Sequence, residues 1–271
     1  GASVLASALG YGYLVTALIQ AGRWPRPFAW PRKARHMLPF LRFAGPVLFA
    51  VFLKTMTLAN MTTAACGLGT AAAAGHQLFQ TLFLLSAVAL GNPLSWAAQA
   101  FLPPLLAAYC AGREPGEVSQ TAVVTLRKLV AFALCGSVPT SFLVVLFCRK
   151  LGWLLSNDPS VLQVMAESSY SLVPFLMLYP VLLTLEGALY GAQERVTVLC
   201  LSALFWWLSG AAMHILSFCG MLTLSRIWLS VGLACAVSMV ATGFFALREI
   251  RRPKCYLFVD DATAPPAAAR K

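Results

Sequence analysis

Charged residues are scarce in this sequence of 271 residues, and acidic residues are the scarcest of them. Only 11% of the residues are charged and 59% are hydrophobic, whereas soluble domains have about 25% charged and about 45–50% apolar residues. The 9 Asp and Glu stand against 20 Lys and Arg, which gives a net charge of +11. This composition excludes an ordinary water-soluble core and is typical of a polytopic membrane protein.

Catalytic and metal-binding motifs are also missing. The sequence contains no GxSxG, HExxH or P-loop motif. Its eight cysteines are spread singly, with no CxxC and no Cys/His zinc spacing. Most of them lie in or at the ends of apolar stretches, where cysteine behaves as a small hydrophobic residue. We therefore expect neither a metal site nor a disulfide framework.

Long apolar stretches dominate what remains. A membrane-spanning helix needs about 20 apolar residues, and seven stretches of the sequence qualify: Ala2–Ile19, Phe43–Gly67, Gln77–Ala98, Leu129–Phe147, Leu172–Tyr190, Thr197–Cys219 and Ile227–Leu247. The third continues apolar to Ala108, which is too long for one straight crossing. We expect its prolines, Pro93, Pro103 and Pro104, to kink or end it.

The basic residues indicate how the spans cross the membrane. If the first span ends on the inner side, the outer segments hold only Arg149, Lys150 and Arg226, and Lys54 lies within a span. All other Lys and Arg residues fall in inner segments, as the positive-inside rule requires. The same asymmetry explains the positive net charge without nucleic acid as a partner.

The layout predicts an all-α membrane protein made of one span followed by six. Residues 1–20 would be the last helix of an N-terminal lobe, and residues 43–250 a six-helix C-terminal lobe. Residues 21–42 are basic and contain tryptophans, which predicts a linker on the inner leaflet. Residues 251–271 are expected to form a disordered tail. No basic segment precedes the first apolar stretch, so we interpret the chain as a piece of a longer protein and not as starting with a signal peptide.

Polar side chains inside spans are costly and are candidates for function. In the second and third spans they follow helical spacing, and the candidates for a substrate cavity are Lys54, Thr57, Asn60, His76, Gln80, Asn92, Ser95 and Gln99. The alternatives are a lysine that reaches the interface or pairs internally, and polar groups that only form hydrogen bonds between helices. His214, near the outer end of the sixth span, is expected to be a hydrogen-bonded histidine of the bundle.

Glu186 is the single acid well inside a span. Counted from Gly191, it lies about 7–8 Å from the inner end, whereas Lys54 lies about 16 Å deep, near the midplane. Glu186 could reach the inner interface or pair with a neighbour such as Lys54, or it could accept a proton. Gly187 and Gly191 beside it would permit a close helix approach.

Several motifs resemble the MATE (multidrug and toxic compound extrusion) family, and most closely its DinF-type branch with plant plastid-envelope members. They are, in chain order, LGTAAAAGHQLFQTLF, GNPLSWAAQAFLP, LLSNDPSVLQ, LEGALYGAQE and SRIWLSVGL. The resemblance covers the chain as helices six to twelve of twelve. It implies two six-helix lobes around a cleft, alternating access, and export of small organic compounds driven by H⁺ or Na⁺, with no other cofactor.

The resemblance also sets further expectations. Some family members have coupling carboxylates in helices seven and eight, where this chain has Lys54 and Asn92, so the coupling site could lie in the N-terminal lobe. Glu186 matches the acid of the family motif at the end of helix ten. We expect the lipid bilayer, a small organic substrate and the N-terminal lobe as partners, in a plastid envelope or plasma membrane. A flippase of lipid-linked substrates with the same fold and an intramembrane enzyme are the alternatives.

Overall fold

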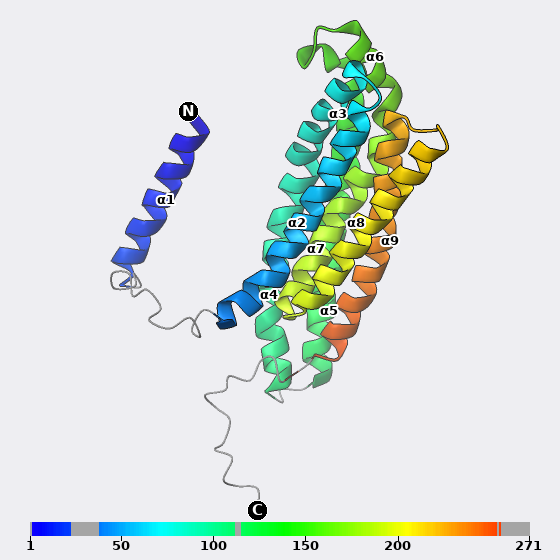
Figure 1. Ribbon diagram of the computed structural model, residues 1–271. Coiled ribbons are helices and arrows are strands. Elements are labelled where there is room, and N and C mark those ends of the chain that lie inside the picture. The colour runs from blue at the N-terminus through cyan, green and yellow to red at the C-terminus, as the bar shows by residue number, and fades with distance from the viewer. Residues whose placement is uncertain (1, 23–37, 112–114, 254, 256–271) are drawn as a thin grey trace, which may run out of the picture. The chain divides into compact units, whose positions relative to one another are not determined.

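The computed structural model describes residues 2–22, 38–111, 115–253 and 255, and this part of the chain is helical without strands. The helices are α1 (Ala2–Gln20), α2 (Leu38–Cys66), α3 (Thr70–Phe83), α4 (Ala89–Cys110), α5 (Pro115–Lys150), α6 (Pro159–Ser168), α7 (Val173–Gly191), α8 (Arg195–Phe218) and α9 (Leu224–Arg251) (Figure 1). The short segments η2 (Leu84–Val88), η3 (Gly152–Leu154) and η4 (Ser169–Leu172) connect some of them.

The chain divides into two units, Gly1–Ala44 and Gly45–Lys271. The first unit contains α1, an apolar helix that corresponds to the first expected span. The second unit is a bundle in which long helices run side by side (Figure 1). Within the described residues, six helical segments are long and apolar enough to cross a membrane. The expected all-α membrane architecture is thus confirmed.

The third span does not end at the prolines where we expected a kink or an end. α3, η2 and α4 form one helical segment, Thr70–Cys110, which runs through Pro93, Pro103 and Pro104 without ending. Pro93 has no N–H to donate, so it leaves the carbonyl one turn earlier without its helical partner. The turn just before it is a π-helix, Leu84–Val88, and such single π turns accommodate local irregularities within long helices. The prolines are therefore absorbed inside one long segment.

The fifth span begins earlier than its apolar stretch suggests. Asp158 caps α6 by accepting a hydrogen bond from the backbone N–H of Ser160, and Pro159 occupies the first turn, as is common at helix starts. The side chain and the backbone N–H of Ser160 hold the pKa of Asp158 below its ordinary value. Helical structure then continues through η4 into α7 and ends at Gly191. This end of the bundle, near α6, is the outer end under the positive-inside assignment.

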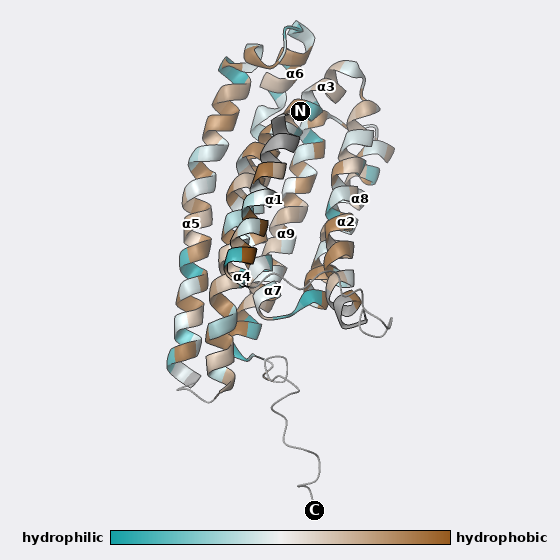
Figure 2. Cartoon of the chain, turned by 90° about the vertical axis from the view of Figure 1, so that its left-hand side faces the viewer, coloured by the Kyte–Doolittle hydropathy of each residue, from teal (hydrophilic) through white to brown (hydrophobic). Residues whose placement is uncertain are grey.

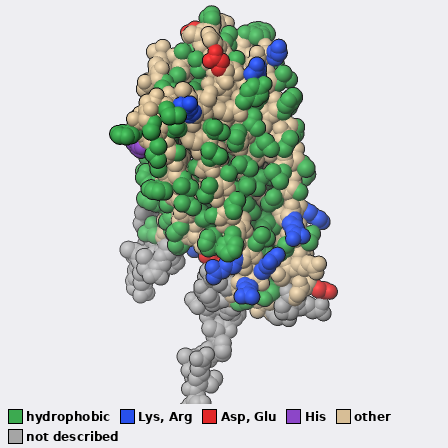
Figure 3. Space-filling view, turned by 90° about the vertical axis from the view of Figure 1, so that its right-hand side faces the viewer, with side chains coloured by type: hydrophobic (Ala, Val, Ile, Leu, Met, Phe, Trp, Pro, Cys, Tyr) green, Lys and Arg blue, Asp and Glu red, His purple; other side chains and the backbone are tan. Residues whose placement is uncertain are grey.

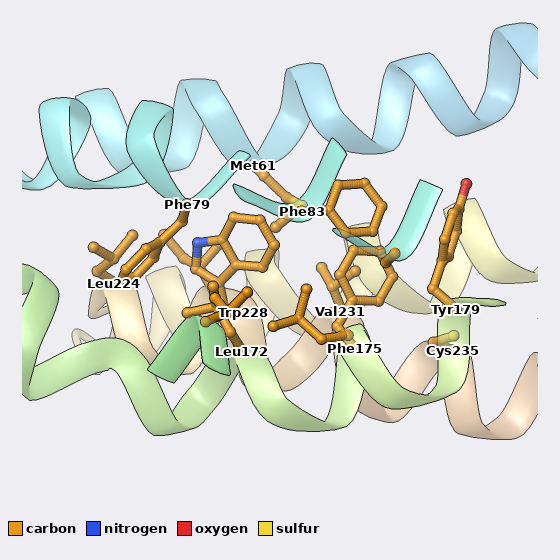
Figure 4. Packing of buried hydrophobic residues seen from close by; sticks show 14 of the residues in the cluster. Met61, Phe79, Phe83, Leu172, Phe175, Tyr179, Leu224, Trp228, Val231 and Cys235 are labelled. Carbon is orange, nitrogen blue, oxygen red and sulfur yellow. The ribbon is translucent and has the colours of Figure 1, made fainter. Parts of the chain in front are cut away.

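Helix α7 is the centre of the bundle. It packs against α4, α5 and α9, and its residues from Tyr179 to Leu189 are all buried. A helix that is apolar on every side is stable only where other helices surround it. Near the outer end of α7, the ring of Phe175 contacts Phe83 of α3 and Trp228 of α9. Phe83 and Trp228 also contact each other, so the three rings connect these helices (Figure 4).

The outside of the bundle is largely apolar. Large hydrophobic side chains such as Phe132, Phe142 and Phe244 are exposed along its length, and hydrophobic colours continue over the long helices (Figure 2). Lys and Arg side chains gather near the two ends and leave a hydrophobic band between them (Figure 3). This distribution is the one that a lipid bilayer requires of a spanning protein.

One expectation about cysteine is wrong. Cys110, at the end of α4, forms a disulfide with Cys255, with 5.1 Å between their Cα atoms. No spacing motif predicts this bond, because 145 residues separate the two cysteines. The bond ties Cys255, placed in the expected disordered tail, to the bundle. The rest of that tail (256–271) and most of the expected linker (23–37) lie outside the described residues, while Leu38–Arg42 already belong to α2.

The tightest helix contact gives a test of the packing. A Cβ added to Gly187 would lie 2.4 Å from the backbone oxygen of Ser95 on α4. Gly187→Ala should therefore force α4 and α7 apart and lower the free energy of unfolding by about 1–3 kcal/mol. Gly45→Ala, where a Cβ meets nothing within 4 Å, is the matched control and should be neutral. The measurement is thermal unfolding of the purified variants in detergent; equal unfolding temperatures would contradict this packing.

Candidate functional site

A buried ion pair joins α2 to α7. The ammonium of Lys54 donates a hydrogen bond to a carboxylate oxygen, Oε2, of Glu186. The glutamate side chain is 4% exposed and that of the lysine 17%. Charged groups in the hydrocarbon region are costly unless they are paired. The pair thus explains how the central helix carries a carboxylate, and it shows Lys54 in the internal pairing that was one of its alternatives.

The position of Glu186 is fixed by the contact between α4 and α7. Gly91, Ser95 and Ala98 follow one face of α4 and meet α7 near Leu183, Gly187 and Gly191 respectively. Small residues at such a crossing let two helix backbones approach closely, as the sequence suggested for the two glycines after Glu186. This close contact fixes the position of the α7 backbone beside Glu186.

Ser95, a predicted cavity residue, packs at this helix crossing. It is buried, and its hydroxyl accepts a hydrogen bond from the side-chain amide of Gln99 at 3.3 Å. Gln99 itself is exposed and Asn92 is half-buried. The predicted face of Asn92, Ser95 and Gln99 therefore divides into a packed residue and two residues at the edge of the helix.

Two other predicted cavity residues lie in the core. The hydroxyl of Thr57 donates to the backbone oxygen of Leu53, and the residue is 1% exposed. His76 is fully buried, with its Nε2 3.1 Å from the hydroxyl of Thr62 and its ring 5.5 Å from that of Trp228. Thr57 thus bonds within its own helix, and His76 packs inside the bundle. Gln80, one turn after His76, is half-buried.

Asn60 lies in a separate, polar groove. The groove is about 350 Å³ and runs between α2 and α8 in the outer half of the bundle, where Asn60 and Thr63 face Gly210, His214 and Ser217. The Asn60 amide nitrogen lies 4.0 Å from the Cβ position of Gly210, so this glycine leaves room for it. Polar groups on a membrane-facing surface require water, protein or a polar ligand.

The position of His214 differs from the one expected from the sequence. It was expected to be a hydrogen-bonded histidine within the bundle, but it is exposed and lines this groove. Only the pairing of α2 with α8 shows that His214 and Asn60 line the same groove. A single span with one histidine contains no signal of this kind.

The predicted residues thus do not converge on one cavity. They occupy the Lys54–Glu186 pair, the polar groove at Asn60, the α4–α7 crossing and the packed layer around His76. Among the described residues, no group of three or more His, Cys, Asp or Glu side chains could hold a metal ion. The ion pair is the strongest candidate for a functional role among these features, because it is charged, buried and located on the central helix.

Comparison with protein families matches residues 46–216 to MatE. The chain belongs to the MatE family. Comparison with curated proteins finds no match. The MatE match covers α2 to α8 and therefore includes both partners of the ion pair. Members of this family are membrane efflux transporters and not enzymes, so the chain is part of an integral, multi-pass membrane transporter.

Removing one partner of the pair should cost the MatE bundle more than removing both. Lys54→Met leaves a nearly fully buried carboxylate without its cation, for which about 3–5 kcal/mol of destabilisation is typical. In the double variant Lys54→Met/Glu186→Met, apolar side chains replace both charges, so stability should recover most of that loss. The measurement is thermal unfolding and folded yield in detergent.

The control for this experiment is Lys128→Met, which removes an exposed lysine and should have little effect. Additive losses, with the double variant less stable than Lys54→Met, would show that the two side chains do not compensate one another.

Proposed function

We propose that this chain is the C-terminal half of an ion-coupled antiporter that exports small organic compounds by alternating access. The observation that carries the proposal is a buried ion pair next to the central helix of a MatE bundle. Buried charges in membrane spans commonly mark substrate or ion pathways. The coupling ion is H⁺ or Na⁺, and a second lobe completes the cleft.

The motifs that resemble the DinF-type branch support a plastid-envelope or plasma-membrane exporter. Two alternatives remain distinguishable by assay. A flippase of lipid-linked substrates would move a lipid reporter between leaflets, and an intramembrane enzyme would convert a substrate chemically. The family match favours export over both.

Organic anions are the substrate class that we favour. Lys54 is more exposed than its partner, so its ammonium is the group of the pair that a substrate can reach. A substrate carboxylate would compete with Glu186 for this ammonium, and low dielectric surroundings strengthen such an interaction. Asn60, nearly two turns further along α2, lines the separate polar groove nearer the outer end.

This arrangement bears on the role of Glu186. A proton on Glu186 would release Lys54 and so would favour anion binding, since two ligands that each weaken the pair assist one another. Antiport requires the opposite, because the driving proton must displace the substrate. For an anionic substrate, Glu186 is therefore better suited to anchoring α7 to α2. We accordingly assign the coupling site to the other lobe. Its neighbours, Tyr179, Tyr190 and Cys235, add no second acid beside it.

The substrate class can be tested in the full-length transporter. Lys54→Gln should weaken export of organic acids at least tenfold, whereas export of organic cations should change little, because only anions gain from the lysine charge. The measurement is efflux from proteoliposomes loaded with either class, normalised to folded protein. An equal loss for both classes would mean that Lys54 is structural alone.

The role of Glu186 has its own test. Glu186→Gln keeps the shape and many of the hydrogen bonds but cannot take up a proton. If Glu186 anchors the helix, efflux should still increase with an imposed proton gradient. Lys128→Gln controls for the purification and reconstitution. An efflux rate that no longer responds to the gradient, in protein that folds and binds substrate, would instead assign the coupling proton to Glu186.

A further inference from the structure

Two apolar grooves on the outside of the bundle end in cations. The first, of about 540 Å³, lies between α8 and α9 and is lined by Leu208, Ala212 and Leu216 on one side and by Leu233 and Val237 on the other. The second, of about 400 Å³, lies between α5 and the η4–α7 segment, with Phe142, Leu146 and Met177 among its lining residues. Arg226 lines the outer end of the first groove, and Arg149 and Lys150 line the outer end of the second.

These three cations are the ones that depart from the charge pattern of the chain. They are the Lys and Arg residues that the positive-inside assignment leaves on the outer side. α5 ends at Lys150 and α9 starts at Leu224, so all three lie at the outer end of the bundle. The grooves extend from them toward the middle of the membrane.

The lengths of the grooves match one leaflet. From Arg226 to Val237 is about 16 Å along α9, and from Lys150 to Val138 is about 18 Å along α5, at about 1.5 Å per residue. Half of a hydrocarbon core of about 30 Å is about 15 Å. An acyl chain lying in either groove would therefore run from the headgroup level to about the midplane.

The cations are held at the openings of the grooves. The guanidinium of Arg226 donates to the backbone oxygen of Met221 at 2.6 Å, which leaves most of its five N–H donors for another acceptor. The guanidinium carbon of Arg149 lies 4.9 Å from the ring centre of Tyr170, in a cation–π contact at the second groove. Guanidinium groups with fixed positions suit phosphate oxygens.

We propose that each groove binds one outer-leaflet phospholipid with a net negative headgroup, with an acyl chain along the helices and the phosphate at the cations. The proposal accounts for the outer cations and for the two grooves together. It does not depend on the transported substrate or on the coupling ion, because neither groove is lined by Lys54 or Glu186.

The test compares two lipids with the same acyl chains on the purified full chain. Phosphatidylglycerol should bind more tightly than phosphatidylcholine in native mass spectrometry and should raise the unfolding temperature more. Each cation removed by Arg226→Gln, Arg149→Gln or Lys150→Gln should weaken phosphatidylglycerol binding by about fivefold, equivalent to about 1 kcal/mol. Lys128→Gln, the same charge change at the inner end, should leave this preference intact.

The acyl-chain part of the proposal needs a separate variant. Ala212→Phe fills the first groove and should weaken both lipids alike, while glycerol phosphate without acyl chains should not stabilise the protein. Equal binding of the two lipids to the unmodified chain, or an equal loss in Lys128→Gln, would overturn the proposal. So would stabilisation by glycerol phosphate alone. The cation variants change exposed or half-exposed side chains and are expected to fold, so the headgroup test stands even if Ala212→Phe does not fold.

Discussion

The packing of the bundle depends on a cation that neutralises the buried carboxylate of Glu186. The stretch of α7 from Tyr179 to Leu189 is buried, and an isolated carboxylate at Glu186 would cost several kcal/mol there. Lys54 of α2 supplies the positive charge. This requirement fixes which face of α2 turns inward and how far along α7 it lies. Thr57, one turn further on α2, is consequently buried, and Asn60 emerges at the polar groove.

The close crossing of α4 and α7 makes the pair rigid. Gly187 leaves no space for a side chain against Ser95, and Gly91 and Gly191 continue the contact in both directions. A carboxylate on a helix that is held this closely keeps its orientation with little entropy left to lose on pairing. In the alternating-access cycle proposed above, such a closely packed centre would let α7 move with α4 as one body.

Apolar length and loop charge were sufficient to predict the helical membrane fold, because these features depend on each segment alone. The partner of Glu186 was only a possibility from the sequence, since Lys54 lies 132 residues away and the two depths counted from helix ends differed. The same limit applies to Cys110 and Cys255, to His76 beside Trp228 and to His214 beside Asn60. Spacing along one helix shows which residues share a face, but it does not show which helix that face meets. An end at the prolines of α4 was one of the two expected outcomes, but the helix continues through them because neighbouring helices can stabilise a proline-containing span.

The state of the Glu186 carboxyl in the membrane tests the central claim most directly. Isotope-edited infrared spectroscopy of the reconstituted protein, with Glu186→Gln to assign the signal, reports whether this group is ionised. The ion pair predicts an ionised carboxylate at neutral pH in the unmodified chain and a protonated carboxyl in Lys54→Met, because an unpaired charge is costly in a buried site. A Glu186 signal that stays ionised after Lys54→Met would contradict the ion pair as the interaction on which this bundle depends.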